Sequence, residues 1–213
     1  MTLAILAHTQ HGCQGSSART RGWRKGESSE LEHEELRNYC VQILRRYELP
    51  EGIIDHSRRV ARVAEFIADK LKASGYSVDT GNVVAGALLH DIGKSKIHKR
   101  RSAVNHAEAS AEIVIREGLE ELAPIVSRHI LDAIISENHP PLTWEEKTVF
   151  YADKIVTHKL VSLEERFNDL LERRLDIKHL LNAAYKPTKA LESEVLRSAG
   201  ISWEDLKARL AEE

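Results

Sequence analysis

The chain has 213 residues, a length typical of one domain with an added segment. Its formal net charge of −2 argues against an overall basic field for nucleic acid, so nucleic acid is not the expected partner. No apolar stretch reaches the length of a membrane span, so we expect no membrane association. The two cysteines, Cys13 and Cys40, form no CxxC pair, which argues against a cysteine zinc site and favours a reducing, cytoplasmic setting.

The first thirty residues differ in composition from the rest of the chain. Gly, Ser, Arg and Gln dominate residues 10–29, where apolar residues do not recur with a helical period. Such a composition cannot bury enough apolar surface to offset the entropy of ordering. Residues 1–30 are therefore predicted to be a flexible, disordered or weakly ordered extension.

Helical periodicity begins after this extension and continues to the end of the chain. Apolar residues recur at intervals of three and four, which is the spacing of one helix face. The segments with this spacing that precede residue 160 are 31–47, 53–73, 79–90, 105–117, 122–135 and 144–158. Asp79 or Thr80, Asn105 and Thr143 stand where side-chain caps begin helices, and Thr143 with Glu146 forms a capping-box pattern.

The C-terminal quarter reads as a series of shorter amphipathic helices. They are expected over 162–174, 177–184, 188–198 and 202–211, with Lys186-Pro187 as one of the breaks between them. No residue here forms an obvious chemical constellation. The segment is predicted to cover the preceding domain or to form a homo-oligomer through its helices.

The most informative stretch is the end of the central apolar helix. An apolar run from residue 83 to residue 89 ends in His90-Asp91, and adjacent imidazole and carboxylate groups can both bind one metal ion. Gly93 suits a left-handed turn at a helix end. Lys94 follows it, where an ammonium group could meet a phosphate.

Four further polar residues stand inside apolar stripes: His56, His106, His129 and Asp153. A single such histidine is usually bonded to a backbone carbonyl in the core, and Asp153 could form a buried salt bridge with a nearby Lys or Arg. So many together, on successive predicted helices, favour a shared metal ion. Imidazole with carboxylate suits Mn, Fe, Co, Ni or Zn better than Mg or Ca.

Basic residues flank these positions. The segment 94–101 is rich in Lys and Arg, which is typical of a solvated loop but could also steer anionic substrates. Arg59 lies one turn from His56, close enough to reach an anionic ligand.

The order His56, His90-Asp91, Asp153 resembles the H…HD…D signature of the HD superfamily of metal-dependent phosphohydrolases. The four residues from His90 match its HDIG subgroup, and the chain is similar to small archaeal-type HDIG hydrolases over residues 53–156. The resemblance implies an all-α HD-domain helical bundle with extra C-terminal helices. Three regions follow: the extension at 1–30, the metal-binding domain at 31–160, and a helical appendage at 161–213.

The resemblance also implies a ligand set. The first ion would be held at the four signature positions: His56, His90, Asp91 and Asp153. Asp91 would bridge to a second ion, together with His106 and one further histidine. His129 is our choice for that histidine and His139 is the alternative; with neither, the site would hold a single divalent ion.

The implied activity is hydrolysis of a phosphoester or phosphoanhydride bond by metal-activated water. The expected substrate is a small phosphorylated molecule, in first place a nucleotide. Asp91 and Lys94 are the candidate catalytic residues, and Lys94 and Arg59 the candidate substrate-binding residues. A general acid is not assigned, although His98 and His139 are near in sequence.

Three other functions remain open at this point. The domain could be a non-catalytic HD module that binds a nucleotide signal or a protein partner. It could be a di-iron oxygenase on the same fold. RNA as a substrate has only the basic loop in its favour.

Overall fold

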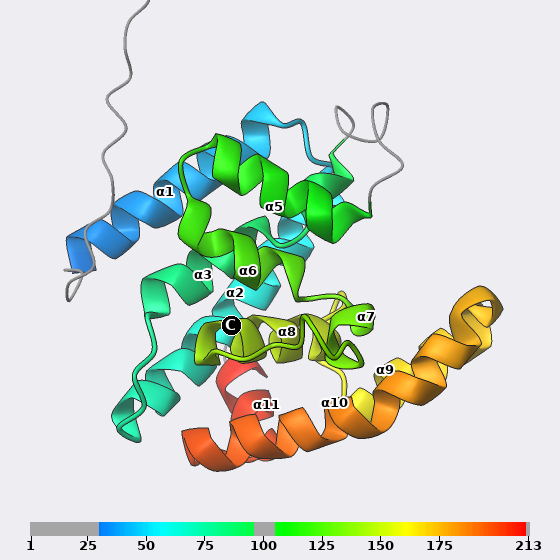
Figure 1. The fold of residues 1–213 in the computed structure, drawn as a ribbon. Helices are drawn as coiled ribbons and strands as arrows, with labels where there is room; N and C mark the ends of the chain where they lie inside the picture. Colours follow the sequence, from blue (N-terminus) through cyan, green and yellow to red (C-terminus); the bar gives the residue numbers. More distant parts are fainter. Residues whose placement is uncertain (1–29, 96–104, 212–213) are drawn as a thin grey trace, which may run out of the picture.

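The computed structural model describes residues 30–95 and 105–211, and Figure 1 shows that they form a bundle of helices. The elements are α1 (Glu30–Arg46), α2 (Glu51–Ala73), α3 (Thr80–Leu89), η1 (Ile92–Lys94), α5 (His106–Arg116), η2 (Glu120–Leu122), α6 (Ala123–Ser127), α7 (Leu131–Ile134), α8 (Trp144–Ile155), α9 (Leu163–Arg173), η3 (Leu175–Ile177), α10 (Lys178–Ala199) and α11 (Trp203–Ala211). The only β-type pairing among the described residues is one isolated bridge between Val156 and Leu160. The all-α prediction is confirmed.

Two predictions fall on residues that the structure does not describe. The N-terminal extension lies almost wholly within 1–29, and most of the basic loop, with His98, lies within 96–104. For the described helices, none combines the length and the apolar character that crossing a bilayer requires.

Helix α3 is the centre of the bundle. It packs on α1, α2, α6 and α8, and of its ten residues only Thr80 and Asn82 are not buried. A Cβ added to Gly86 would lie 2.5 Å from the Cγ2 atom of Ile125 on α6, so only glycine permits this approach. The small residues in the middle of α3 therefore allow the close packing that the sequence suggested.

The predicted helix starts are confirmed by their caps. The Asp79 carboxylate accepts a hydrogen bond from the Asn82 backbone N–H at 2.9 Å, and the Asn105 side chain accepts from two backbone N–H groups of α5. Thr143 and Glu146 form the reciprocal capping box of α8. The Asn105 and Thr143 caps fix the first turns of the helices that carry His106 and Asp153.

A network centred on Glu117, just after α5, ties this helix to α1. Tyr47 donates to the Glu117 carboxylate at 2.9 Å, Tyr39 donates to its backbone carbonyl at 3.2 Å, and Arg46 forms an ion pair with it. The Glu117 side chain is only 13% exposed, so these contacts are partly shielded from water. They hold α5 in a fixed position relative to α1.

The prediction of one helix over 122–135 was wrong. The segment holds the last residue of η2, then α6 and the single turn α7, with a break at residues 128–130. At this break the ammonium group of Lys154 donates to the backbone carbonyl of His129 at 2.6 Å. In a continuous helix the His129 carbonyl would accept a hydrogen bond from a backbone N–H group. Here the Lys154 ammonium group takes that place, so the break leaves this carbonyl satisfied.

The prediction of a break at Lys186-Pro187 was also wrong, because α10 continues through Pro187. A proline inside a helix leaves the carbonyl four residues earlier without its usual donor. That residue is Ala183, which is exposed, so water can hydrate its carbonyl. The buried residues Leu181 and Leu191 lie on either side of the proline, and packing through them keeps the helix continuous. In Figure 1, α10 runs along one side of the bundle, and it packs on α2, α7 and α8.

Candidate metal centre

Each predicted ligand lies at or near the end of an element, or on an inward face. His90 is the C-cap of α3, and Asp91 follows it directly. His106 is the first residue of α5, and His129 stands in the break between α6 and α7. His56 comes from α2 and Asp153 from α8. The fold brings all six side chains into one cluster, from segments spread over a hundred residues.

One half of the cluster contains His56, His90 and Asp153. The Nε2 atom of His56 lies 3.0 Å from Oδ1 of Asp153, and Nε2 of His90 lies 3.4 Å from the same oxygen. One nitrogen or oxygen atom from each of the three residues lies within 4.8 Å of the others. This spacing is compatible with three ligands that surround one transition-metal ion at about 2.0–2.2 Å.

The other half contains Asp91, His106 and His129. The Nε2 atoms of His106 and His129 lie 3.1 Å apart, and both face Oδ1 of Asp91 at 3.6 and 3.5 Å. Oδ2 of Asp91 is directed to the first half, 3.4 Å from Nε2 of His90. The two oxygens of Asp91 therefore face different halves of the cluster.

Backbone contacts orient two of the imidazoles. The Nδ1–H groups of His90 and His129 donate to the carbonyls of Ala87 and Val126, each at 2.7 Å. A neutral imidazole with its proton on Nδ1 has its lone pair on Nε2. Both Nε2 atoms point into the cluster, which is the orientation that a metal ligand needs.

Two buried polar atoms of the cluster make no hydrogen bond to other described residues, which also fits a metal site. Nε2 of His90 and Oδ1 of Asp91 are buried and have no hydrogen-bond partner within the described part of the chain. Buried polar atoms without partners are costly, and a cation between them removes that cost. The His and Asp donors match the preference of Mn, Fe, Co, Ni or Zn.

Electrostatics also indicate a place for positive charge. Burial lowers the pKa of His90, but the adjacent Asp91 and Asp153 carboxylates outweigh this effect and raise it to about 10, so a metal ion that binds Nε2 would displace the proton that these carboxylates otherwise stabilise there. Burial raises the pKa of Asp91, yet His90 and His129 hold it well below its usual range. For His106, burial and the neighbouring His129 lower the pKa to about 4, so this imidazole is neutral at pH 7. The carboxylates thus retain their charge and stabilise a cation beside them.

The cluster has a buried floor and an open rim. The side chains of His90 and Asp91 are 0% and 4% exposed, whereas those of His56 and His106 are 21% and 34% exposed. A ligand can therefore approach from the side of His56 and His106.

Two lysines contact the carboxylates. Lys94 Nζ lies 2.7 Å from Oδ2 of Asp91, and its side chain is 37% exposed, so it lies between the cluster and solvent. Lys154 is buried, and its Nζ lies 2.5 Å from Oδ2 of Asp153 while it also donates to His129. The salt bridge considered for Asp153 therefore coexists with its contacts to the histidines, because each uses a different oxygen. The sequence analysis gave no role to Lys154.

Gly93 is required for a reason other than the one expected. It does not adopt positive φ; it lies in η1, pressed against the first turn of α5. A Cβ on Gly93 would lie 2.2 Å from the His106 carbonyl oxygen. Ser110, which the sequence analysis missed, binds the same junction: its hydroxyl accepts from the Gly93 N–H at 3.0 Å and lies 2.7 Å from the His90 carbonyl. The left-handed prediction for Gly93 was wrong, and close helix packing explains the residue.

The remaining candidates lie apart from the cluster. His139 is exposed in the loop before α8, with no described contact to the cluster, whereas His129 is buried within it. Arg59 is half-buried on α2, and its Nε donates to the Thr157 carbonyl at 3.3 Å. Its guanidinium is therefore anchored near the end of α8, the helix that carries Asp153.

Residues 53–157 match the HD domain family. An uncharacterised protein of Methanocaldococcus jannaschii is 36% identical to this chain over 117 residues, which are 50% of this chain and 67% of that protein. The chain belongs to the HD domain family, whose domains are generally metal-dependent hydrolases. No solved structure shows significant similarity to it.

Other relatives carry names that refer to RNA. A tRNA (cytidine(56)-2'-O)-methyltransferase of Picrophilus torridus is 31% identical over 78% of this chain and 48% of its own length. A ribonuclease Y of Pseudothermotoga lettingae is 31% identical over 58% of this chain and 22% of its own length. The chain spans half or less of these two proteins.

Proposed function

We propose that this protein is a metal-dependent phosphohydrolase of the HDIG subgroup, with its active site at the cluster around Asp91. The observation that carries this proposal is the position of Asp91, whose two oxygens face two separate groups of imidazoles. Such an arrangement suits two divalent ions bridged by one carboxylate. His56, His90 and Asp153 would hold the first ion, and His106 and His129 the second.

The chain's own residues would prepare the substrate and the site. Lys94, at the rim beside Asp91, is placed to bind a phosphate oxygen and offset its negative charge. The backbone contacts of His90 and His129 would hold their imidazoles ready, so that little reorganisation is needed. The bound metal would supply a water of lowered pKa and neutralise charge on the phosphate.

The reaction would be the hydrolysis of one phosphorus–oxygen bond. Water adds its oxygen to phosphorus, the bond to the leaving oxygen breaks, and that oxygen takes up a proton. The expected substrate class is a nucleotide or another phosphoester. RNA is a second candidate, which the names of the relatives favour, since a methyltransferase for tRNA and a ribonuclease both share this region.

The regional division also belongs to this proposal. Residues 31–160 would form the catalytic domain and 161–213 a helical layer packed on it, which the contacts of α10 with α2 and α8 support. A non-catalytic module that binds a nucleotide or a protein partner is the alternative. His90 Nε2 and Asp91 Oδ1 are buried without a hydrogen bond to any described residue, with their nearest charged partners at 3.4–3.6 Å, which favours the metal enzyme because a cation between these atoms would offset the cost of burying them.

The test is an Asp91→Asn variant, with Asp176→Asn as its control. Asn keeps the shape of Asp but removes its charge, and Asp176 is an exposed residue of η3. In protein purified without chelator, Asp91→Asn should lower bound metal, measured by elemental analysis. It should also reduce hydrolysis of a panel of nucleotides and oligonucleotides by more than about 100-fold, measured as released phosphate, nucleoside or shortened oligonucleotide. The control should match the unaltered chain.

Two results would contradict this proposal. One is an unaltered chain that releases no product with Mn, Fe, Co, Ni or Zn. The other is an Asp91→Asn variant that keeps its metal and its activity. Nucleotide binding that survives Asp91→Asn, without any hydrolysis by the unaltered chain, would support the non-catalytic alternative.

A further inference from the structure

Two groups of helices carry the residues of the candidate metal centre. Helices α2, α3 and α8 pack on one another, and they hold His56, His90 and Asp153 within them or at their ends. In the second group, α5 begins with His106 and packs on α6, and His129 follows α6. Figure 1 shows α5 and α6 next to each other. The turn η1, directly after α3, packs on α5 and lies where the two groups meet.

Ser110 on α5 forms hydrogen bonds across this meeting point. Its hydroxyl donates to the His90 carbonyl oxygen at 2.7 Å and accepts from the Gly93 backbone N–H at 3.0 Å, so it binds the chain both before and after Asp91. The same hydroxyl lies 2.8 Å from the carbonyl oxygen of His106, one turn earlier on α5. One side chain thus contacts the backbone of a predicted ligand from each half of the cluster.

The contacts of Ser110 with the η1 turn are difficult to replace. Bonding to the carbonyl four residues earlier is common for a serine inside a helix, but the contacts with His90 and Gly93 join separate segments. Ser110 is 0% exposed, so water has no access to replace its hydroxyl. Without that hydroxyl, two buried backbone groups would each lose a hydrogen-bond partner, which is costly. The turn and α5 would therefore move relative to each other.

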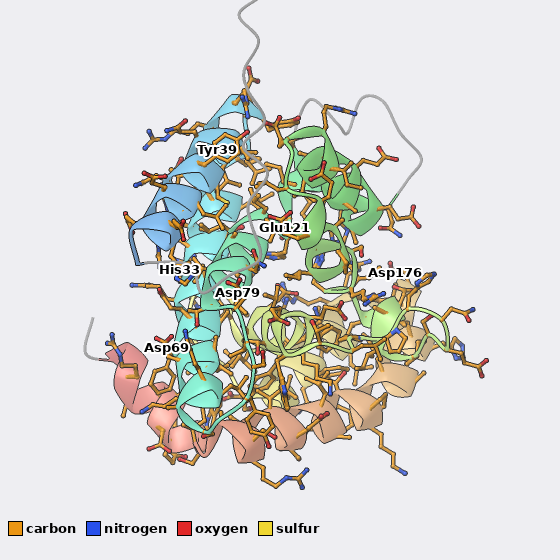
Figure 2. All side chains as sticks on the ribbon, turned by 60° about the vertical axis from the view of Figure 1, so that its left-hand side comes forward. His33, Tyr39, Asp69, Asp79, Glu121 and Asp176 are labelled. Atoms are coloured by element: carbon orange, nitrogen blue, oxygen red, sulfur yellow. The ribbon has the colours of Figure 1, made fainter. Side chains whose placement is uncertain are left out.

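Such a movement would act on His106. The far end of α5 is tied to α1, where Tyr39 donates to the Glu117 carbonyl at 3.2 Å, and Figure 2 shows Tyr39 on α1 beside α5. The near end of α5 carries His106 and is bound to η1 through Ser110. The distance of 3.6 Å between His106 Nε2 and Asp91 Oδ1 therefore depends on this contact. Metal ligands must lie within a few tenths of an ångström of their preferred bond length, so a small displacement matters.

We propose that Ser110 is a positioning residue that sets the distance between Asp91 and His106 and thereby controls the binding of the second metal ion. The inference deepens the proposed function and rests on it, because it requires that Asp91 bridge two ions. It concerns the distance between the two halves of the cluster, to which the sequence pattern gives no guide.

The first ion should depend much less on Ser110. The helices that carry its other ligands pack directly on one another, and α5 is not one of them. The imidazole of His90 is oriented by its Nδ1–H bond to the Ala87 carbonyl within α3. A residue that only supports the fold would weaken the binding of both ions alike. Selective loss of the second ion is therefore the result that distinguishes a positioning role from a structural one.

The test compares Ser110→Ala with Thr188→Val as the control. Thr188 is also 0% exposed, and its hydroxyl donates to the Ala184 carbonyl at 2.7 Å on α10, a helix that carries no residue of the cluster. Each full-length protein is stripped of metal with a chelator, and calorimetric titration with Mn²⁺ gives the number of sites and the affinity of each. Electron paramagnetic resonance then distinguishes two magnetically coupled Mn²⁺ ions from a single ion, and circular dichroism measures the helical content.

The Ser110→Ala protein should bind the second Mn²⁺ about 10- to 100-fold more weakly, the range found when a group that supports a metal ligand is lost. The signal of the coupled pair should weaken accordingly, whereas the affinity for the first ion should match that of the unaltered chain. The Thr188→Val protein should retain both sites.

Four results would overturn the inference. They are unchanged binding of both ions by Ser110→Ala, an equal loss of both ions, a loss of helical content in that variant, and an unaltered chain that binds a single ion. Hydrolysis of phosphoesters by the unaltered chain is measured separately. A chain that binds one ion and still hydrolyses phosphoesters would overturn this inference and leave the proposed activity intact, so the two failures are distinguishable.

Discussion

The buried ammonium group of Lys154 connects the two halves of the candidate metal centre. It binds Oδ2 of Asp153 on one side and the His129 carbonyl on the other. The contact leaves Oδ1 of Asp153 free to face His56 and His90. Lys154 is thus a positioning residue, which sets the direction of a carboxylate and the position of an imidazole.

Replacement of Lys154 by Met should weaken metal binding by about 10- to 100-fold, the range found when a partner of a metal ligand is lost. Met fills a similar volume but leaves Asp153 free to rotate and the His129 carbonyl without its donor. Isothermal titration with Mn²⁺ measures the change. Lys147→Met, on the same helix but paired with Glu194, is the matched control and should bind as the unaltered chain does. If the Lys154→Met protein is less stable but binds Mn²⁺ with unchanged affinity, Lys154 supports the fold and does not position the metal ligands.

The sequence predicted the histidines of this cluster but not the lysine. Each histidine interrupts an apolar stripe, which is a local signal. Lys154 follows Asp153 on a helix and is typical of an exposed residue, because its burial depends on the break between α6 and α7. That break depends on the tertiary contact between Lys154 and the His129 carbonyl, so the sequence near residue 129 does not predict it.

At the scale of elements, most helix starts could be predicted because caps are local. The Thr143 and Ser162 capping boxes, for example, involve only residues within one turn. The two errors, at 122–135 and at Pro187, share a cause: in each, packing decided whether the helix continued. A proline normally ends a helix, but the buried stripe of α10 outweighs it.

Replacement of Pro187 by Ala should therefore stabilise the protein, by about 1–2 kcal/mol. The substitution restores a helix donor worth up to about 3 kcal/mol, and part of this gain is lost because Ala leaves the unfolded chain freer. The midpoint of urea unfolding measures the effect. A neutral or destabilising result would mean that the helix ends at the proline, as the sequence alone suggests.

At the scale of the molecule, the core contains groups that resist losing a proton. Burial raises the pKa of the Cys40 thiol to about 12, from 9.0. Burial and the nearby Glu192 carboxylate also raise the pKa of Tyr151. Because the folded state holds these protons more tightly than the unfolded state, their contribution to stability is complete below about pH 9 and falls as the pH rises toward 12.

Urea unfolding at pH 8, 9.5 and 10.5 should show this loss, at up to about 1.4 kcal/mol per pH unit for Cys40 alone. A Cys40→Ala variant should be less stable at every pH, owing to its cavity, but its stability should decline less steeply with pH. If the stability of the two proteins declines equally with pH, the pKa of the Cys40 thiol is not raised in the folded state.

Two glycines bracket the His90-Asp91 pair, and neither has room for one added methyl group. Gly86 meets Ile125 on one side, and Gly93 meets the start of α5 on the other. Divergence in an HD lineage is therefore expected to leave this segment nearly unaltered. New substrate preferences should arise instead on the outer face of α2, where side chains can be exchanged without moving a helix.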